Sequence, residues 1–211
     1  MGRKARLKAE RAAAQPAVIS ADFQQTPVPS DRRLLAAIAV ALVILVAIVF
    51  AQVRNHEFLT YDDPIYITEN EQVQKGLTAE GVAWAFRSFD FNWHPITWLT
   101  HMIDVELFGM NAGAHLLVNA AIHAINAILL LLVLTRATGF VWRSAVVAAL
   151  FAIHPLHVES VAWLAERKDV LSSLFLLLTV WFYLRFVERR SKLHYALMLV
   201  MFILGLMSKG M

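Results

Sequence analysis

The sequence contains no cysteine among its 211 residues. It therefore cannot form a disulfide, hold a metal through a thiolate or use a cysteine nucleophile, and the redox state of its compartment cannot be inferred. It also lacks an internal repeat and any H-E-x-x-H metal motif. These absences leave oxygen and nitrogen side chains as the groups from which a functional site could be built.

Apolar residues dominate what is present. The chain is 59% hydrophobic with a mean hydropathy of +0.58, well above an ordinary soluble domain, so lipid must be part of its solvent. The fold class that we predict is an all-α, polytopic membrane helix bundle of about five transmembrane helices. These helices are expected at residues 33–53, 115–135, 140–158, 169–186 and 193–208.

The placement of lysine and arginine predicts the orientation of these helices. Of the 19 basic residues, 13 lie in the N-terminal tail or in the connections after the second and fourth expected helices. Positive loops stay in the cytoplasm, so the N-terminus is expected there and the loop 54–114 on the extracytoplasmic face. Residues 1–32 are expected to form a disordered basic tail, and residues 33–53 to remain as a signal anchor. Together, residues 33–211 make one expected membrane domain.

The extracytoplasmic loop is predicted to contain juxtamembrane amphipathic helices. Thr78 is a candidate N-cap for a short helix that ends near Ser88. Pro95 opens a second expected helix that runs to about Phe108. The loop carries nine carboxylates against three bases, which argues against nucleic acid as a partner.

Four polar side chains form a stripe on the second expected span. His115, Asn119, His123 and Asn126 fall within about 80° of one another on a helix of 3.6 residues per turn. Such a stripe cannot comfortably face lipid, so it should point into the bundle or into a wet cavity. It could join helices through hydrogen bonds, or it could contact a substrate or a lipid head group.

Two further clusters of ionisable residues flank the spans. Asp62 and Asp63 follow the first span, and residues 154–169 read HPLHVESVAWLAERKD. Read alone, the acidic pair fits a solvated turn before Pro64, and the second segment fits a charge-balanced interfacial turn. Three residues of that segment could instead ligate a metal, but the spacing matches no known zinc motif, so no metal or cofactor is expected. The three are His154, His157 and Glu159.

The motifs taken together resemble one family. YDDPIYITEN, NWHPITWLTHMIDVELFGMNAGAHLLVNAAIHAIN, HPLHVESVAWLAERKDVLS and LGLMSKGM resemble the membrane portion of the transmembrane and TPR-containing O-mannosyltransferase-like proteins. These proteins are members of the GT-C superfamily of polyprenyl-phosphate-sugar-dependent glycosyltransferases. The resemblance covers about residues 55–211 and implies a partial GT-C fold, truncated before the remaining helices and the TPR region. Gly210 stands where the family pattern suggests proline.

The resemblance implies an inverting glycosyltransferase of the EC 2.4 class with an acidic residue of the first loop at its centre. Asp62 is the expected general base, and Asp63 would raise the pKa of Asp62 or bind the acceptor. Positive charge for the leaving lipid phosphate is expected from Arg167, Lys168 or Lys209. Further substrate contacts are expected from His94, His101, Glu159 and Glu166.

The expected reaction moves a mannose-like sugar from a polyprenyl-phosphate donor to a hydroxyl acceptor, such as a protein Ser or Thr, at the extracytoplasmic face. A bacterial inner membrane with a periplasmic site is the expected location. Two alternatives stay open: a non-catalytic truncated module or partner subunit, and a transporter whose polar path is lined by histidines.

Overall fold

A computed structural model describes residues 32–89 and 92–210 of the chain. The expected disordered tail, residues 1–32, lies outside the described residues apart from Arg32. Within the described ranges the backbone forms helices joined by turns and irregular connections, and it contains no strand. The all-α fold class is therefore confirmed.

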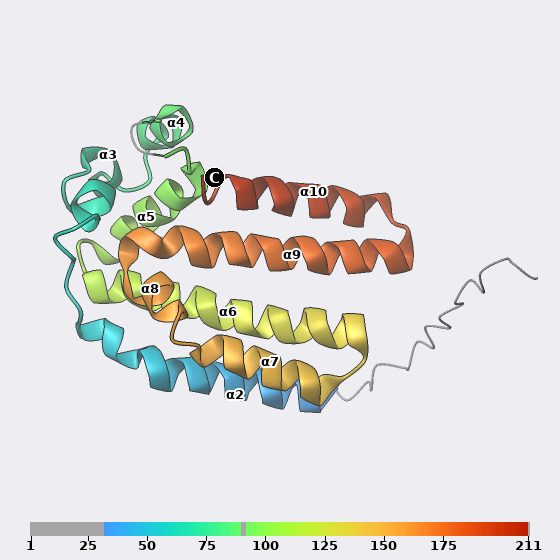
Figure 1. Cartoon of the computed structure of the whole chain (residues 1–211). Helices are drawn as coiled ribbons and strands as arrows, with labels where there is room; N and C mark the ends of the chain where they lie inside the picture. Colours follow the sequence, from blue (N-terminus) through green and yellow to red (C-terminus); the bar gives the residue numbers. More distant parts are fainter. Residues whose placement is uncertain (1–31, 90–91, 211) are drawn as a thin grey trace, which may run out of the picture.

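Five long helices lie side by side and form the bundle (Figure 1). Helix α6 is central and packs against α2, α7 and α9, whereas α10 packs against α9. Three helical segments within the described residues are long and apolar enough to cross a membrane, and α7 and α10 are shorter apolar helices. The helices are α2 (Arg32–Phe50), α6 (Ala112–Thr138), α7 (Val141–Ile153), α9 (Arg167–Arg189) and α10 (Lys192–Leu206).

The remaining helices, which are short, gather at one end of the bundle, which we call the loop end (Figure 1). The helices expected within the loop 54–114 are confirmed: the Thr78 side chain accepts a hydrogen bond from the Gly81 amide at 3.0 Å, and Pro95 opens α5. These short elements are η1 (Ala51–Asn55), η2 (Pro64–Thr68), α3 (Glu71–Gln74), α4 (Ala79–Arg87), α5 (Pro95–Phe108), α8 (His157–Ala162) and η3 (Leu164–Glu166).

Local sequence fixes both ends of the central helix. The Asn111 side chain caps the first turn of α6 by accepting a hydrogen bond from the Ala114 amide at 3.0 Å. Gly139 ends α6 in a left-handed conformation with φ of 77°. A side chain at Gly113 would place its Cβ 2.0 Å from the Arg54 carbonyl oxygen, so only glycine allows η1 to approach α6 this closely.

The segment between α7 and α9 differs from the expected helix at residues 140–158. Helix α7 ends at Ile153 because Pro155 disfavours helical geometry at His154, which is extended with ψ of 130°. The chain then forms α8, passes through an extended Trp163 and one 3₁₀ turn, and begins α9 at Arg167. This broken path turns backbone carbonyls and amides toward the bundle interior.

The polar stripe on α6 faces the interior, as its spacing predicts. All four side chains are buried, and each one binds a backbone carbonyl on another segment. His115 contacts the Gly109 oxygen at 2.8 Å, and the Asn126 amide donates to the Val170 oxygen at 2.8 Å. Three of the four side chains make the interhelical hydrogen bonds of the first interpretation: His123 joins α6 to α7, Asn119 to the broken segment and Asn126 to α9.

Candidate active site

The acidic pair lies where the outer loop meets the start of α9. The Asp63 carboxylate is 1% exposed and accepts hydrogen bonds from the Leu59 amide at 2.8 Å and the Ala165 amide at 3.3 Å. Burial raises the pKa of the Asp63 carboxyl above its usual value, and the neighbouring Asp62 adds to the rise, whereas the two amides oppose it. Asp63 therefore ties the loop to η3.

Asp62 is placed differently from its neighbour. Its side chain is partly exposed, and among the described residues its carboxylate makes no hydrogen bond or ion pair. Both oxygens of Asp62 are thus available to an incoming group, whereas those of Asp63 are already used. Of the two, Asp62 is the one that could accept a proton from a substrate.

Lys168, in the first turn of α9, lies close to Tyr66, which follows the acidic pair. Its ammonium group pairs with the Glu166 carboxylate at 2.8 Å and lies 5.4 Å from the centre of the Tyr66 ring. Burial raises the pKa of the Tyr66 hydroxyl, and the Lys168 charge opposes the rise. Tyr66 follows the acidic pair by one turn, so this contact brings Lys168, Glu166 and the pair into one neighbourhood.

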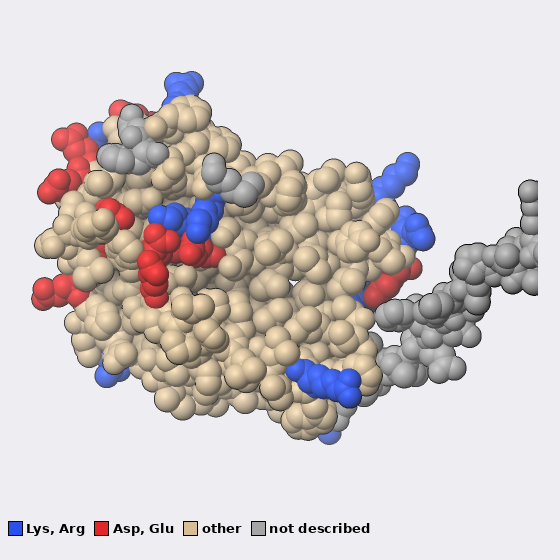
Figure 2. Space-filling view, viewed as in Figure 1, with Lys and Arg blue, Asp and Glu red and all other residues tan. Residues whose placement is uncertain are grey.

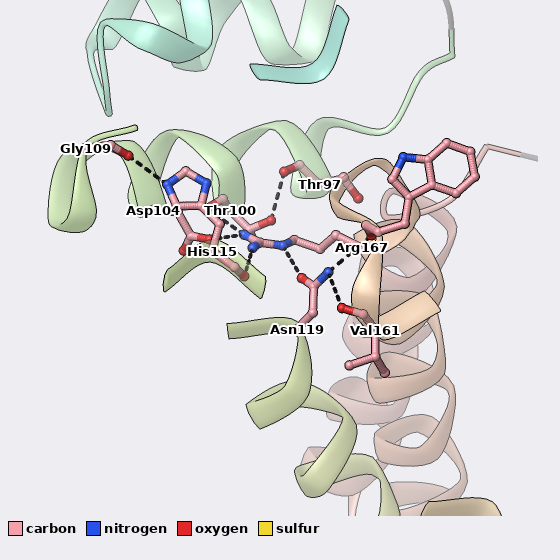
Figure 3. Close-up of polar contacts among 9 residues, drawn as sticks. Thr97, Thr100, Asp104, Gly109, His115, Asn119, Val161 and Arg167 are labelled. Carbon is pink, nitrogen blue, oxygen red and sulfur yellow. Dashed lines mark hydrogen bonds and ion pairs between the residues drawn. The ribbon is translucent and has the colours of Figure 1, made fainter. Parts of the chain in front are cut away.

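Arg167 has a different environment from the one expected for a phosphate ligand. Its side chain is fully buried and its guanidinium lies 2.5 Å from the Asp104 carboxylate (Figure 3). It also donates to the Asn119 side chain at 2.7 Å, the His115 carbonyl at 2.7 Å and the Thr100 carbonyl at 3.3 Å. All of these partners are protein groups, so we assign Arg167 a positioning role.

The network around Arg167 connects three helices at the loop end. Asp104 and Thr100 belong to α5, His115 and Asn119 to α6, and Arg167 to α9. The Asn119 amide also lies 3.4 Å from the Val161 carbonyl at the end of α8 (Figure 3). A buried charge needs such a complete set of partners, because an unpaired one costs several kcal/mol. The network therefore fixes the segment that presents the Ala165 amide to Asp63.

A second polar centre forms around Asp169, the residue after Lys168 in α9. The Lys209 ammonium group pairs with the Asp169 carboxylate at 2.5 Å, and the Ser160 hydroxyl lies 3.3 Å from the other Asp169 oxygen. Lys209 is held at the loop end because the Thr97 hydroxyl donates to the Ser208 carbonyl at 2.6 Å. The Lys209 side chain is 44% exposed, so it remains accessible to a ligand.

This second centre borders a cavity that continues into an apolar groove. The polar cavity has a volume of about 210 Å³ and is lined by residues that include Asn126, His157, Asp169 and Lys209. The groove, about 250 Å³, runs between α9 and α10, and apolar side chains and Gly205 line much of it. Both share three lining residues, Ser172, Ser173 and Lys209. We call the two together the α9/α10 groove.

His94 and His101, expected substrate contacts, are fully buried in an aromatic cluster. The His94 ring stacks on Trp98 at 4.7 Å and on Tyr66 at 5.5 Å, and the His101 ring meets Tyr66 edge-on at 6.2 Å. The ring nitrogens of both histidines lack a hydrogen-bond partner among the described residues. In this arrangement the two histidines support Tyr66, which lies between them and Lys168.

Burial lowers the pKa of His94 to about 4, and the Lys168 charge adds to the shift. In the unfolded chain His94 takes up a proton below about pH 6.5, whereas in the folded chain it does so only near pH 4. The free energy of unfolding should therefore fall as the pH decreases from about 6.5 to about 4. We expect His94→Phe to remove about 2 kcal/mol of the destabilisation between pH 7 and pH 5. Thermal unfolding of the solubilised protein at the two pH values measures it.

The matched control is His56→Phe, because the His56 side chain is exposed. This variant should keep the full loss of stability at acidic pH, and part of the loss should persist in His94→Phe, since burial also lowers the pKa of His101 well below its usual value. An unchanged difference between pH 7 and pH 5 in His94→Phe would contradict the buried, neutral state of His94.

The remaining expected site residues are placed less centrally. Glu159 lies in the first turn of α8 with an exposed side chain, and Glu166 is held by Lys168. Within residues 32–89 and 92–210, no group of three or more His, Asp or Glu side chains is arranged to hold a metal ion. Sequence reasoning did not assign a site role to Tyr66, Asp104 or Asp169, although each lies inside a motif that it singled out.

Charged side chains divide between the two ends of the bundle. In Figure 2, acidic side chains gather at the loop end, where red and blue groups also meet on the visible face, and several basic groups lie at the opposite end. The ion pairs of Lys168 and Lys209 belong to the loop end. The loop end thus combines carboxylates, the accessible Lys209, the partly buried Lys168 and a groove with apolar walls.

Comparison with known proteins identifies the family to which the chain belongs. The family model for dolichyl-phosphate-mannose-protein mannosyltransferases matches residues 95–211, more than half of the chain. The chain is therefore a member of this family of membrane mannosyltransferases, and the resemblance read from its motifs is confirmed. No solved structure matches it.

Individual relatives support the same assignment. Protein O-mannosyl-transferase TMTC1 of Mus musculus is 30% identical over 143 residues, which cover 61% of this chain and 15% of the relative. Protein O-mannosyl-transferase Tmtc2 of Drosophila melanogaster is 33% identical over 102 residues, 47% of this chain and 11% of the relative. The chain thus spans less than a fifth of the length of these relatives.

Proposed function

We propose that the chain carries the donor-binding part of a membrane mannosyltransferase that moves a mannose-like sugar from a polyprenyl phosphate to a hydroxyl acceptor. The observation that carries the proposal is the α9/α10 groove. It joins an apolar channel between two membrane helices to a polar cavity at whose edge lies Lys209. A polyprenyl phosphate has the same division into an apolar chain and an anionic head.

The two ends of the groove differ in polarity, so each part of such a donor can be given a position. The isoprenoid chain would lie between α9 and α10, and the phosphate would lie near Lys209 and the hydroxyls of Ser172 and Ser173. The charge of Lys209, which is paired with Asp169 and 44% exposed, would lie beside the phosphate. Such fixed positive charge stabilises the negative charge that develops on a leaving phosphate.

Asp62 completes the reaction that we propose. Its carboxylate takes the proton of the acceptor hydroxyl as the oxygen attacks the anomeric carbon of the sugar, and the bond from that carbon to the phosphate oxygen breaks. Polyprenyl phosphate leaves with the electron pair of that bond. A single displacement of this kind inverts the anomeric configuration. The roles of Asp62 and Lys209 follow the expectations from the sequence, and Arg167 acts through the position of α9.

The charge distribution supports an orientation for this chemistry. Basic residues of the two short connections lie at the end opposite the loop end, so we infer that the opposite end faces the cytoplasm and the loop end the extracytoplasmic side. A bacterial inner membrane, with a periplasmic loop end, is the location that we propose. The α6 histidines bind backbone carbonyls, which gives no support to a transport path along them.

Transfer from labelled polyprenyl-phosphate mannose tests the proposal. Membranes that contain the protein should move label from the lipid to a hydroxyl-bearing acceptor, and membranes without it should not. Equal transfer in both preparations would overturn the proposed function.

Substitution of Lys209 tests the place of the donor phosphate. Lys209→Gln removes one charged hydrogen bond, which contributes about 1.5–3 kcal/mol, so the KM for the donor should rise about 10- to 100-fold. Lys192→Gln is the matched control, because Lys192 begins α10 at the opposite end of the bundle. An equal donor KM in wild type and Lys209→Gln would contradict the placement of the donor phosphate beside Lys209.

A further inference from the structure

A cavity outside the proposed transfer site lies in the extracytoplasmic loop. It has a volume of about 410 Å³, within the range of small-molecule sites, and it borders η2, the helix that follows the acidic pair. None of its lining residues lines the α9/α10 groove. They include Ile65, Glu69, Glu71, Gln72, Trp84 and Trp98.

Two buried polar atoms of this lining have no partner. The Nε1 atom of Trp98, a residue that is 2% exposed, and the Oε1 atom of Gln72 make no hydrogen bond among the described residues. One is a donor and the other an acceptor. Buried polar atoms without partners are rare and costly, so their presence beside a cavity points to a ligand that supplies both kinds of group.

Three aromatic rings pack around the buried Trp98. Tyr66 and His94 stack on Trp98 at 5.0 Å and 4.7 Å, and Trp84 meets it at 5.2 Å in an edge-to-face arrangement. The rings hold Trp98 rigidly, which fixes the position of its N–H group. Trp84 is itself only partly buried and offers an aromatic wall to a ligand.

Charge in the lining narrows the class of ligand. Glu69 and Glu71 are exposed, and no lysine or arginine of the described part of the chain lines the cavity. Two carboxylates repel an anion and accept hydrogen bonds from hydroxyl groups. Each hydroxyl of a sugar both donates and accepts, so a sugar supplies a donor for Gln72 and an acceptor for Trp98, and the apolar face of its ring matches an indole.

We propose that this cavity is a binding site for a neutral saccharide, separate from the site of sugar transfer. As an element of the proposed function, it would hold a sugar already attached to the acceptor or to the product, next to the helix that follows the acidic pair. Binding itself requires only the described loop residues, so it can be measured without a donor and without turnover.

The test titrates the 211-residue chain with methyl α-mannoside and follows tryptophan fluorescence. Lipid nanodiscs are needed, because alkyl glycoside detergents carry sugar head groups that would compete. We expect saturable binding with a dissociation constant on the order of 1 mM, since the contacts are a few hydrogen bonds without a charged pair. Gln72→Met should weaken binding about tenfold, because methionine has a similar length but lacks the buried acceptor.

Three further variants separate the possible outcomes. Glu71→Gln changes only an exposed side chain of the lining and should also weaken binding, whereas Glu80→Gln, on α4 outside the lining, should not. Asp62→Asn should keep full binding even if it abolishes transfer, so the two proposals can fail separately. Absence of saturable binding, or equal binding in wild type, Gln72→Met and Glu71→Gln, would overturn the assignment.

Discussion

Asp62→Asn is expected to lower the rate of sugar transfer by a factor of about 10² to 10⁴, the usual contribution of a positioned general base. The amide cannot take the acceptor proton, yet it has nearly the shape of the carboxylate. No hydrogen bond or ion pair is lost among the described residues, because the Asp62 side chain makes none there. Transfer of labelled mannose in membranes, normalised to the amount of protein, measures the effect.

The neighbouring aspartate provides a contrast. Asp63 binds the amides of Leu59 and Ala165, so Asp63→Asn should lower the thermal stability and reduce transfer through the position of η3. Glu57→Gln, an exposed acid before the pair, is the control and should leave both unchanged. Full activity in Asp62→Asn at normal protein levels would exclude Asp62 as the base.

Arg167→Met is expected to lower the free energy of unfolding by about 3–5 kcal/mol, because it leaves the buried Asp104 carboxylate without its partner. Three further hydrogen bonds of the guanidinium, to Asn119 and to two backbone carbonyls, are lost with it. Thermal unfolding of the solubilised protein, followed by loss of the monodisperse peak, measures the change.

Two controls test whether the loss of stability comes from the buried, unpaired charge. The ion pair of Arg136 and Glu188 lies at the opposite end and is partly exposed, so Arg136→Met should cost less than about 1 kcal/mol. The double variant Arg167→Met with Asp104→Leu removes both buried charges and should recover part of the loss. A loss in Arg167→Met no larger than that in Arg136→Met would show that the network does not hold the loop end together.

Periodicity and capping residues predicted much of the fold. Thr78 and Pro95 located two loop helices, because N-caps and first-turn prolines act locally. The spacing of the stripe from His115 to Asn126 predicted that these residues face the interior, since a helix fixes their common direction. The end of α7 at Ile153 was missed, although Pro155 was the local signal for it.

The candidate site was predicted only in part, because pairings between distant segments have no local signal. Arg167, Lys168 and Lys209 looked equivalent as basic residues near one membrane face. Only the packed bundle shows that Asp104 encloses Arg167 and that Lys209 borders a groove. The hydrogen bond from the Ala165 amide to Asp63, 102 residues away in the chain, is likewise a consequence of tertiary packing.

Photo-crosslinking of the donor tests the central claim most directly. A polyprenyl phosphate with a photoreactive group beside its phosphate should label peptides from the first turn of α9 and the end of α10, near Asp169 and Lys209. Lys209→Gln should reduce this labelling. Labelling confined to the apolar groove between α2 and α6, lined by residues such as Val43 and Ala124, would contradict the proposed donor site.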